Sequence, residues 1–472
     1  MFLVVLILLW CAVFALWWYV KPRRPSPPLC PGVLPIIGHA HLIVRLQVIH
    51  IRAVLAVLEI LVYAFTFRRI AYGTATIITD VDDCLTVSNT CLDKPYLYNF
   101  GKKLYNRGLV TANALTWKPH RKLLHPAFNQ QILNTFVQEY TMQAKRLVTE
   151  LSTEVGKDPF DVVPYLRSVS RPSTRWTDDQ MTIENYAHAT DRFFSLLEDR
   201  IFSVWLHLPV IFNMSYLKKK QDAVIQILKN ITETFNFLFR QHLGRLLRLG
   251  YKSLLDLLLD VGEKQVLTDE EIREHLDTII GAAYDSSTRA MTFCLILLGT
   301  YPDVQERILK ELQEVLDDPD KDLTRHDLPK LVYLEAVLKE TLRLYPPVPR
   351  IGKCSDSTVN LKHYTFPAGS TFILSLYGMN RHPMWGADAN EFNPERWLNP
   401  ATLPDNPNAF ATFSIGKRNC IGKQSAMMSM KTTLAYILRR YRVTGDIKNV
   451  QCKCDLILKP VIGHYIGLEL RT

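Results

Sequence analysis

The chain has 472 residues, of which 48% are hydrophobic and 22% are charged, and its formal net charge is +10. These proportions are typical of a globular protein and exclude disordered, collagen-like and low-complexity classes. Its nine cysteines contain no CxxC pair, which argues against a disulfide scaffold, a zinc ribbon or a thioredoxin-type site. No single Lys/Arg block dominates, so the positive charge indicates a membrane surface or an acidic partner and no nucleic acid.

The N-terminus predicts a membrane anchor. Residues 2–20 carry no charge, and at about 1.5 Å per helical residue they would span about 28 Å, close to the hydrocarbon core of a bilayer. Lys21, Arg23 and Arg24 follow at once. We therefore expect a single-pass anchor over residues 1–21 in the endoplasmic reticulum membrane, with the rest of the chain cytoplasmic. A cleaved signal peptide is the alternative, but a basic n-region and an obvious cleavage site are missing.

A proline-rich segment follows the anchor. Prolines fix φ and remove amide donors, so residues 22–38 predict a stiff, extended hinge. A second apolar stretch at 53–67 is interrupted by Glu59 and is too short to cross a bilayer, and we expect a core helix leading into a strand. No Gly/Ser-rich linker or internal repeat divides the remainder. Residues 39–472 are therefore predicted to form one domain, although about 150 residues per domain would suggest three.

The elements predicted in this domain are mostly helical. A β-like stretch comes first at 70–79, and a polar, proline-containing segment at 169–184 is predicted to be a loop. Later β-like stretches lie at 371–376 and 455–470. Cys452 and Cys454, just before the second stretch, could suggest a metal site, but no His cluster accompanies them, and free thiols near the surface are expected. Apolar residues at helical spacing predict helices at 223–249, 269–299, 303–316, 330–345 and 425–441. The pattern indicates a mainly α fold with small β-sheets.

Cys420 lies between a glycine-bearing loop and the last of these helices. Its sulfur would sit at a helix N-terminus, where unpaired amides and the helix dipole favour a thiolate. Gly416 and Gly422 allow the backbone to approach a flat or bulky group closely. The guanidinium of Arg418 can donate two hydrogen bonds to a carboxylate. These features suit haem ligation through sulfur. The alternative is a buried structural cysteine, and spacing alone does not decide between them.

The same segment resembles the haem-binding loop of the cytochromes P-450, Phe-x-x-Gly-x-Arg-x-Cys-x-Gly. All five defining positions match, at Phe413, Gly416, Arg418, Cys420 and Gly422. The resemblance implies the cytochrome P-450 fold, preceded here by one transmembrane helix. It also implies Cys420 as the axial ligand of the haem iron, and the other four as haem-binding residues. The anchor and hinge resemble those of microsomal members. Short stretches of the sequence are similar to the branch of the family that contains fatty-acid ω-hydroxylases and insect enzymes.

A second motif implies a structural triad. Glu340 and Arg343 resemble the family's Glu-x-x-Arg, and residues 394–397 resemble its Pro-Glu-Arg-Phe, with Trp in place of Phe. Three-residue spacing puts Glu340 and Arg343 on one helix face. Such a pair is usually an exposed ion pair that contributes little to the stability of the fold. The resemblance implies instead a buried triad in which Arg343 and Arg396 share the carboxylate of Glu340.

Trp117 and Arg121 resemble the Trp-x-x-x-Arg pair that holds the haem propionates. Four-residue spacing aligns them only in a helix, and Pro119 lies between them, so a helix is expected to start near here. Lys353 stands where related chains often carry another propionate-binding arginine. A lysine ammonium cannot donate two parallel hydrogen bonds to a carboxylate as an arginine does, so a contact between Lys353 and a propionate is left open.

The oxygen-activation segment departs most from the family pattern. Residues 282–287 read Ala-Ala-Tyr-Asp-Ser-Ser, and Asp285 and Ser286 keep the acid and the alcohol that would deliver protons to dioxygen. Serine lacks the methyl group that restricts χ1, so a looser relay is expected. Arg289 lies four residues after Asp285 and is placed to pair with it, which would disfavour the protonated acid. The alternative is an ordinary buried helix that tolerates polar groups.

Ala282 replaces a glutamate that forms an ester to the haem in much of the ω-hydroxylase branch. We therefore expect non-covalent haem b. The resemblance implies a monooxygenase that inserts one oxygen atom from dioxygen into a hydrophobic small molecule, using electrons from an NADPH-dependent flavoprotein reductase. Lysines that flank the ligand-side motifs offer a surface for that reductase: Lys118, Lys122, Lys417 and Lys423. Two alternatives stay open: a peroxide-rearranging enzyme that needs no reductase, and a haem-binding relic with impaired oxygen activation. The substrate is not identified.

Overall fold

The structure is a computed structural model, and it describes residues 66–69, 73–169, 180–247, 267–318, 320–454 and 456–471. The anchor predicted at 1–21 and the hinge predicted at 22–38 lie outside the described residues. So does the apolar stretch at 53–67, except where strand β1 begins at Thr66. Within the described ranges, no helix combines the length and the apolar character that crossing a bilayer requires.

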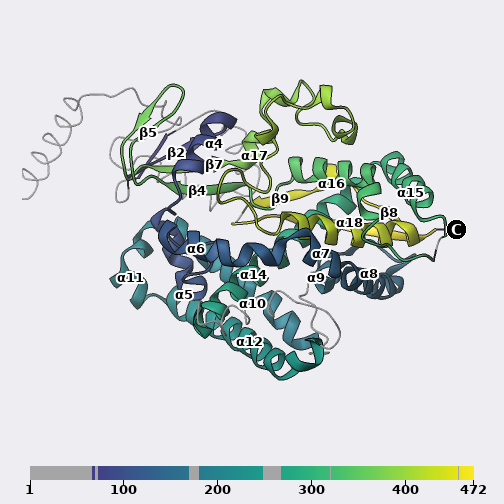
Figure 1. The fold of residues 1–472 in the computed structure, drawn as a ribbon, viewed down its shortest axis with the longest axis horizontal. Coiled ribbons are helices and arrows are strands. Elements are labelled where there is room, and N and C mark those ends of the chain that lie inside the picture. The colour runs from purple at the N-terminus through teal and green to yellow at the C-terminus, as the bar shows by residue number, and fades with distance from the viewer. Residues whose placement is uncertain are drawn as a thin grey trace, which may run out of the picture.

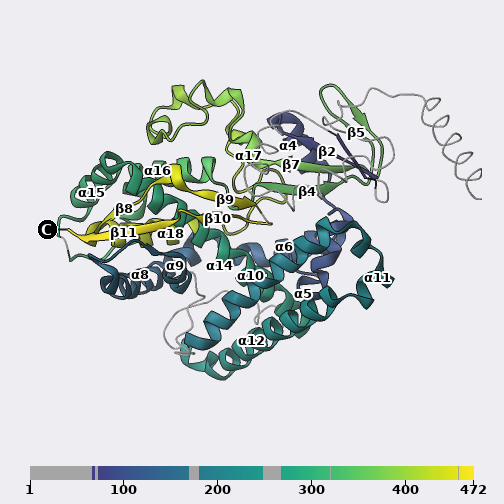
Figure 2. The same cartoon turned by 180° about the vertical axis from the view of Figure 1, so that it is seen from behind.

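Helices make up most of the molecule, and a smaller sheet-rich part lies at one end (Figure 1). Helices α10 and α12 lie side by side along one edge, and the views from front and back agree on this (Figure 2). The long helices are α8 (Val137–Leu151), α10 (Gln180–Phe202), α12 (Tyr216–Leu247), α14 (Asp269–Thr300), α15 (Pro302–Leu316), α16 (Val332–Leu344) and α18 (Lys423–Arg440). The short helices are α4 (Val81–Thr90), α5 (Lys102–Tyr105), α6 (Ala114–Leu124), α7 (Gln130–Thr135), α9 (Val163–Val169), α11 (Pro209–Met214) and α17 (Leu376–Met379).

The largest described sheet has four strands in the order β1-β2-β7-β4. Its strands are β1 (Thr66–Arg69), β2 (Gly73–Ile78), β7 (Thr371–Ser375) and β4 (Arg350–Cys354). Strands β2 and β7 are parallel, and the other two pairings are antiparallel. The remaining strands form β3-β11-β8, β10-β9 and β5-β6: β3 (Phe160–Asp161), β11 (Tyr465–Leu470), β8 (Tyr441–Thr444), β10 (Leu458–Ile462), β9 (Gln451–Cys454), β5 (Val359–Asn360) and β6 (Thr365–Phe366).

The main hydrophobic core joins the C-terminal half of α14 to α8, α16 and α18. Leu295, Leu334 and Leu434 are fully buried in it. Helix α14 begins with a capping box, in which the Thr268 hydroxyl accepts from the Glu271 amide and the Glu271 carboxylate accepts from the Thr268 amide. The core therefore holds both α14, which carries the predicted oxygen-activation segment, and α18, which follows the cysteine loop.

Most predicted elements are present within a few residues of their expected ends. The prediction of a loop over 169–184 was wrong at its C-terminal end, because α10 already begins at Gln180, while residues 170–179 lie outside the described part. The expectation of surface thiols at Cys452 and Cys454 was also wrong. Side chains alternate along a strand, so two residues that are two apart share a face, and on β9 both cysteines face the core.

Candidate functional site

Cys420 lies three residues before the first residue of α18, whose N-cap is Gly422. The Cys420 amide donates to the Phe413 carbonyl at 2.8 Å, which closes the loop between these two residues. The thiol is exposed, yet the protein around it displaces water and raises the pKa of Cys420, while the Gly422 amide, then Arg121 and then Lys423 lower it. The amide and the two cations are the groups that stabilise a thiolate here.

The two glycines of the loop have different neighbours. Gly416 has φ +71°, and a Cβ there would lie 2.7 Å from Cβ of Ser88 on α4. The close approach that Gly416 permits is therefore to a helix of the protein. A Cβ on Gly422 would lie 4.0 Å from Sγ of Cys420, so the backbone at Gly422 passes beside the thiol. Phe413 is partly buried and packs against the main core.

Helix α6 begins at Ala114, five residues before Pro119, so both Trp117 and Arg121 are helical. The Arg418 guanidinium lies 4.7 Å from the centroid of the Trp117 ring. Arg121 donates from Nη1 to the Asn419 carbonyl at 3.0 Å and from Nη2 to Oδ1 of Asn419 at 3.2 Å. Arg121 thus supports the backbone next to Cys420, while Trp117 supports Arg418.

Two buried cations of the site have donors without partners. Lys353 on β4 is 0% exposed, and its Nζ makes no hydrogen bond within the described residues. Nε and Nη1 of Arg418 are also buried and unpartnered there. Burial, and then the charge of Arg418, lowers the pKa of Lys353 to about 8. Buried charges are normally paired, so these donors fit an anionic group such as the carboxylates of a haem.

Glu340, Arg343 and Arg396 form one buried network. Arg343 donates to both carboxylate oxygens of Glu340 at 2.8 Å, and Nε of Arg396 donates to Oε1 at 3.0 Å. Nε1 of Trp397 donates to Oε2 at 2.9 Å and the Asn393 amide donates to Oε1 at 3.0 Å. The tryptophan that replaces the family's phenylalanine therefore contributes one more donor to the shared carboxylate.

On α14, Asp285 and Ser286 have different surroundings. Asp285 is 3% exposed and accepts from Nε of Arg289 at 3.1 Å, and Nη2 of Arg167 lies 3.6 Å from the same oxygen. Both arginines also reach Asp191 on α10. The partly exposed Ser286 hydroxyl donates to the carbonyl of residue 282 at 2.8 Å. Within the described residues no hydrogen bond joins the acid to the alcohol.

Two groups in this region carried no signal in the sequence. Arg167 and Asp191 stand in no motif of the sequence; Arg167 approaches Asp285 because α9 packs against α14, and Asp191 on α10 pairs with Arg167 and Arg289. His120 on α6 and His275 on α14 are hydrogen-bonded at 3.0 Å between Nδ1 and Nε2. Burial, and then the charge of His120, lowers the pKa of His275 to about 4. The pair ties the helix beside the cysteine loop to the helix of the proposed relay.

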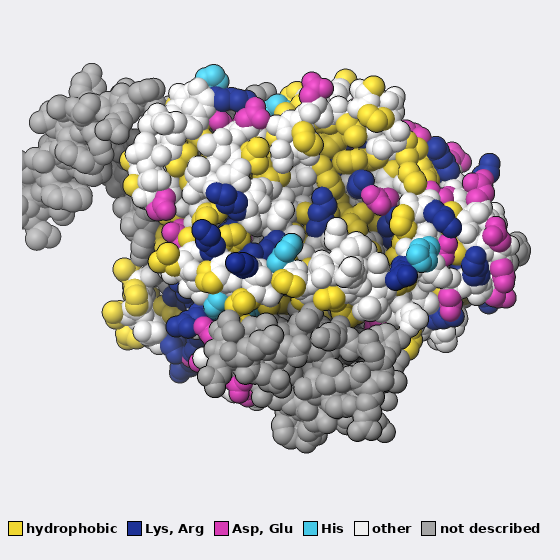
Figure 3. Space-filling view, viewed as in Figure 1, with side chains coloured by type: hydrophobic (Ala, Val, Ile, Leu, Met, Phe, Trp, Pro, Cys, Tyr) yellow, Lys and Arg dark blue, Asp and Glu magenta, His cyan; other side chains and the backbone are white. Residues whose placement is uncertain are grey.

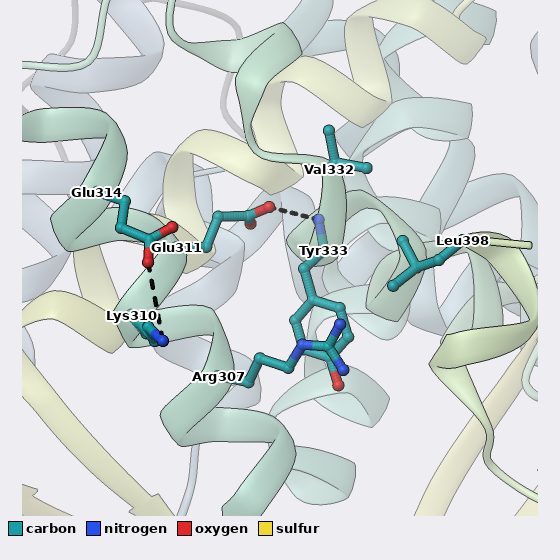
Figure 4. A pocket seen from close by; sticks show the side chains of 7 residues that line it. All are labelled: Arg307, Lys310, Glu311, Glu314, Val332, Tyr333 and Leu398. Atoms are coloured by element: carbon teal, nitrogen blue, oxygen red, sulfur yellow. Dashed lines mark hydrogen bonds and ion pairs between the residues drawn. The ribbon is translucent and has the colours of Figure 1, made fainter.

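A surface groove of about 330 Å³ lies away from these residues, where α15 meets α16 (Figure 4). Its polar side chains already have partners. Glu311 accepts from the amides of Tyr333 and Leu334 at 2.5 and 2.9 Å and so caps α16, and Lys310 pairs with Glu314 at 4.0 Å. The groove therefore offers no convergent reactive groups, and Cys420 remains the candidate functional site.

The chain matches the family described as "Cytochrome P450" over residues 86–465. This protein belongs to the cytochrome P450 family. It is 30% identical to "Cytochrome P450 4d8" of Drosophila melanogaster over 83% of this chain and 90% of the relative. It is 31% identical to "Cytochrome P450 4V2" of Mus musculus over 82% of this chain and 78% of the relative. It is also 27% identical to "Cytochrome P450 4c3" of Drosophila melanogaster over 93% of this chain and 89% of the relative.

Family membership settles the enzyme class and the cofactor. This cytochrome P450 is an oxidoreductase of the haem-thiolate monooxygenase type, and haem b, bound non-covalently, is its cofactor. The predicted resemblance to the family is confirmed, and the Drosophila relatives agree with the predicted similarity to insect members. The mainly helical fold with small sheets is that of the family.

Proposed function

We propose that this cytochrome P450 is a membrane-bound monooxygenase that inserts one oxygen atom from dioxygen into a hydrophobic small molecule, with electrons from an NADPH-dependent flavoprotein reductase. When bound, the haem supplies reductive activation of dioxygen, which a cysteine thiolate ligand favours. The single observation that carries the proposal is the Cys420 thiol beside the Gly422 amide, with Arg121 and Lys423 close enough to stabilise its charge.

Different residues of the chain are proposed to have different roles around the haem. Cys420 would hold the haem iron through its thiolate, and Arg418, whose guanidinium lies over the Trp117 ring, would bind the propionates. Arg121 acts through Asn419 by holding the loop. Phe413, Gly416 and Gly422 shape the same loop.

Asp285 and Ser286 are proposed as the proton relay, with the proton held at the carboxylate of Asp285 and passed to Oγ of Ser286. In the structure the carboxylate is held by Arg289 and lies near Arg167. Proton delivery therefore requires the carboxylate to leave Arg289 and the Ser286 hydroxyl to release its bond to the carbonyl of residue 282.

A basic surface next to the cysteine loop supports the reductase as partner. Lys118 and Lys122 lie on α6, Lys417 lies in the loop and Lys423 begins α18, and all four are exposed. Figure 3 shows several Lys and Arg side chains across the middle of that face, whereas acidic and basic side chains are mixed at the edge near the C-terminus. Positive charges beside the ligand cysteine would attract an acidic electron donor and orient it.

An exposed hydrophobic patch supports contact with a membrane in addition to the expected anchor. Val210 and Met214 on α11 are 72% and 82% exposed, and Trp205, Leu208 and Tyr216 are at least half exposed beside them. Figure 3 shows hydrophobic side chains at the end of the molecule where α11 lies in Figure 1. Large apolar patches mark interaction sites. Three lysines follow at 218–220, and basic residues beside an apolar patch favour an anionic bilayer surface.

The decisive experiment compares electron sources in the purified, membrane-reconstituted protein. We expect a strongly red-shifted Soret band in the carbon-monoxide difference spectrum, and oxygen uptake that requires both NADPH and a flavoprotein reductase. Turnover of hydroperoxides without reductase, and no oxygen uptake, would favour the peroxide-rearranging alternative. A normal spectrum without turnover from any electron source would favour the haem-binding relic.

The membrane contact is tested separately in the full-length chain. Val210→Trp adds one fluorophore to the patch, and Ile462→Trp adds one at another exposed hydrophobic position, on β10. In vesicles that contain brominated lipids, the added fluorescence of the first variant should be quenched and that of the second should not. Equal fluorescence changes in the two variants would contradict a contact at α11.

A further inference from the structure

Four charged side chains from α9, α10 and α14 form a closed ring in which positive and negative groups alternate. Nη2 of Arg167 lies 2.5 Å from Oδ2 of Asp191 and 3.6 Å from Oδ1 of Asp285. Arg289 has the opposite preference, because its Nε lies 3.1 Å from Oδ1 of Asp285 and its Nη2 lies 3.7 Å from Oδ1 of Asp191. Each arginine therefore has one close carboxylate and a second, more distant one.

Three members of the ring are withdrawn from water. The side chains of Arg167, Arg289 and Asp285 are 13%, 6% and 4% exposed, whereas that of Asp191 is 33% exposed. Nε of Arg167 is buried and has no hydrogen-bond partner within the described residues. A buried charge is costly unless it is paired. Both arginines therefore depend on the two carboxylates of the ring.

One further acid lies near the ring. Asp161 on β3 is close enough to Arg289 for their charges to interact. Its carboxylate, however, accepts from the Val163 amide at 2.8 Å and lies 3.5 Å from Nε2 of His464. Asp161 is thus held by partners of its own, and Asp191 is the second carboxylate that Arg289 can use.

The proposed relay changes the charge balance of this ring. A carboxyl group of Asp285 that carries a proton no longer neutralises Arg289, and it must leave that guanidinium to reach Ser286. Asp191 already lies on a different nitrogen of Arg289 from the one that bonds Asp285. A small shift of the Arg289 side chain is therefore enough to exchange one carboxylate for the other, so that the buried cation keeps a counter-ion.

We propose that Asp191 is a positioning residue of the proton relay. It holds Arg167 away from Asp285, and it takes over Arg289 when the carboxyl group of Asp285 turns toward Ser286. Because Asp191 belongs to α10, the position of this helix controls the release of Asp285 on α14. The inference rests on the relay proposed above for Asp285 and Ser286, and it adds a residue that stands in no motif of the sequence.

Replacement of Asp191 separates this role from simple support of the fold. In Asp191→Asn, Arg167 loses its close carboxylate, and the remaining one within reach is Asp285. Two arginines then compete for Asp285, and neither has another ion-pair partner among the described residues when the acid turns away. The carboxyl group is held on the arginines and proton delivery slows. Since Asp191 is only partly buried, the variant should still fold.

The test measures reductase-driven oxygen uptake by the membrane-reconstituted holoenzyme, in H2O and in D2O. Asp191→Asn should slow the uptake by about tenfold. It should also enlarge the ratio of the rates in H2O and D2O, because proton delivery limits the rate more strongly. Asp191→Glu keeps the carboxylate and should recover most of the rate. The matched control is Asp222→Asn on α12, which removes a carboxylate of 32% exposure that pairs with two lysines and should leave both quantities unchanged.

A second set of variants tests the competition between the arginines. Arg167→Gln leaves Asp191 to Arg289 and should not slow the uptake. Combined with Asp191→Asn, it removes one of the two arginines that hold Asp285 and should restore part of the rate. A wild-type rate and isotope ratio in Asp191→Asn would overturn the inference. A slow Asp191→Asn with an unchanged ratio and no recovery in the double variant would overturn it too, because that result indicates structural support alone.

Asp285→Asn, measured alongside, distinguishes this inference from the proposed function. A slow Asp285→Asn together with a wild-type Asp191→Asn would overturn the role of Asp191 alone. Wild-type uptake in Asp285→Asn would overturn the relay and, with it, this inference. A wild-type protein without NADPH- and reductase-dependent uptake would contradict the proposed function itself. If Asp191→Asn does not fold, tenfold slower uptake by Arg167→Gln with a normal haem-thiolate spectrum would overturn the inference.

Discussion

Replacing Glu340 should destabilise the haem domain although it changes none of the residues proposed to bind the haem. The carboxylate is 0% exposed and accepts five hydrogen bonds, three of them from guanidinium groups. In Glu340→Ala, Arg343 keeps only carbonyl acceptors, from residues 380, 389 and 391, whereas Arg396 keeps Oδ2 of Asp388 at 2.8 Å. Arg343 is therefore the buried charge left without a counter-ion.

Removing one member of such a buried network costs about 3–5 kcal/mol, a large part of the roughly 5–15 kcal/mol that stabilises a folded protein. We expect Glu340→Ala to be isolated mostly as misfolded, haem-free protein. The matched control is Glu314→Ala, which removes one partner of an exposed ion pair with Lys310 on α15. Such pairs contribute about 0–1 kcal/mol, so this variant should behave as the wild type.

The assay is the haem content per polypeptide from the carbon-monoxide difference spectrum, together with thermal unfolding followed by circular dichroism. The double variant Glu340→Leu/Arg343→Leu removes both charges of the tightest pair. Because an apolar pair leaves no unpaired charge at these two positions, the double variant should lose less than the sum of the single variants. A Glu340→Ala protein with normal haem content and an unchanged unfolding temperature would refute the reasoning.

Three further predictions concern the haem and α14. Acid-acetone should extract the haem, since Ala282 offers no carboxylate for an ester; haem that stays with the polypeptide would contradict this. Asp285→Asn should lower reductase-driven product formation by about 100-fold or more with an unchanged haem spectrum, and wild-type turnover would exclude a relay through this acid. The pKa of His275 is lowered to about 4, so between pH 6.5 and 4 the unfolded chain binds the extra proton. This contribution to stability is complete above pH 6.5 and is lost as the pH falls, by about 3 kcal/mol. His275→Gln should flatten that part of the stability profile, and an unchanged slope in urea unfolding would argue against it.

Local spacing explains what the sequence could predict about the site. The cysteine loop and the Glu-x-x-Arg pair are each contained within ten residues, so chain connectivity and helix geometry bring their side chains together. Helix α18 begins close to where the run after Cys420 predicted it, and Glu340 and Arg343 share a face of α16. The possible pair of Asp285 with Arg289 was foreseen for the same reason and is present at 3.1 Å.

Contacts between distant segments could not be read from spacing. Arg167 on α9 approaches Asp285 on α14, and His120 on α6 meets His275, because separate helices pack against one another. The burial of Cys452 and Cys454 could not be predicted for the same reason. Which face of β9 packs against the core is decided by the neighbouring elements, and both cysteines lie on that buried face.

By itself, the sequence determined the family, the candidate ligand cysteine, the helix that follows it and the members of the Glu340 network. These depend on residue type and on spacing along one element. Only the tertiary structure decided which charged side chains meet across separate elements. Nη2 of Arg167 on α9 lies 3.6 Å from Asp285 because α9 packs against α14, and Lys353 on β4 is fully buried with its ammonium unpartnered within the described residues. Spacing along one element cannot show such contacts, because they depend on how distant segments pack and exclude water.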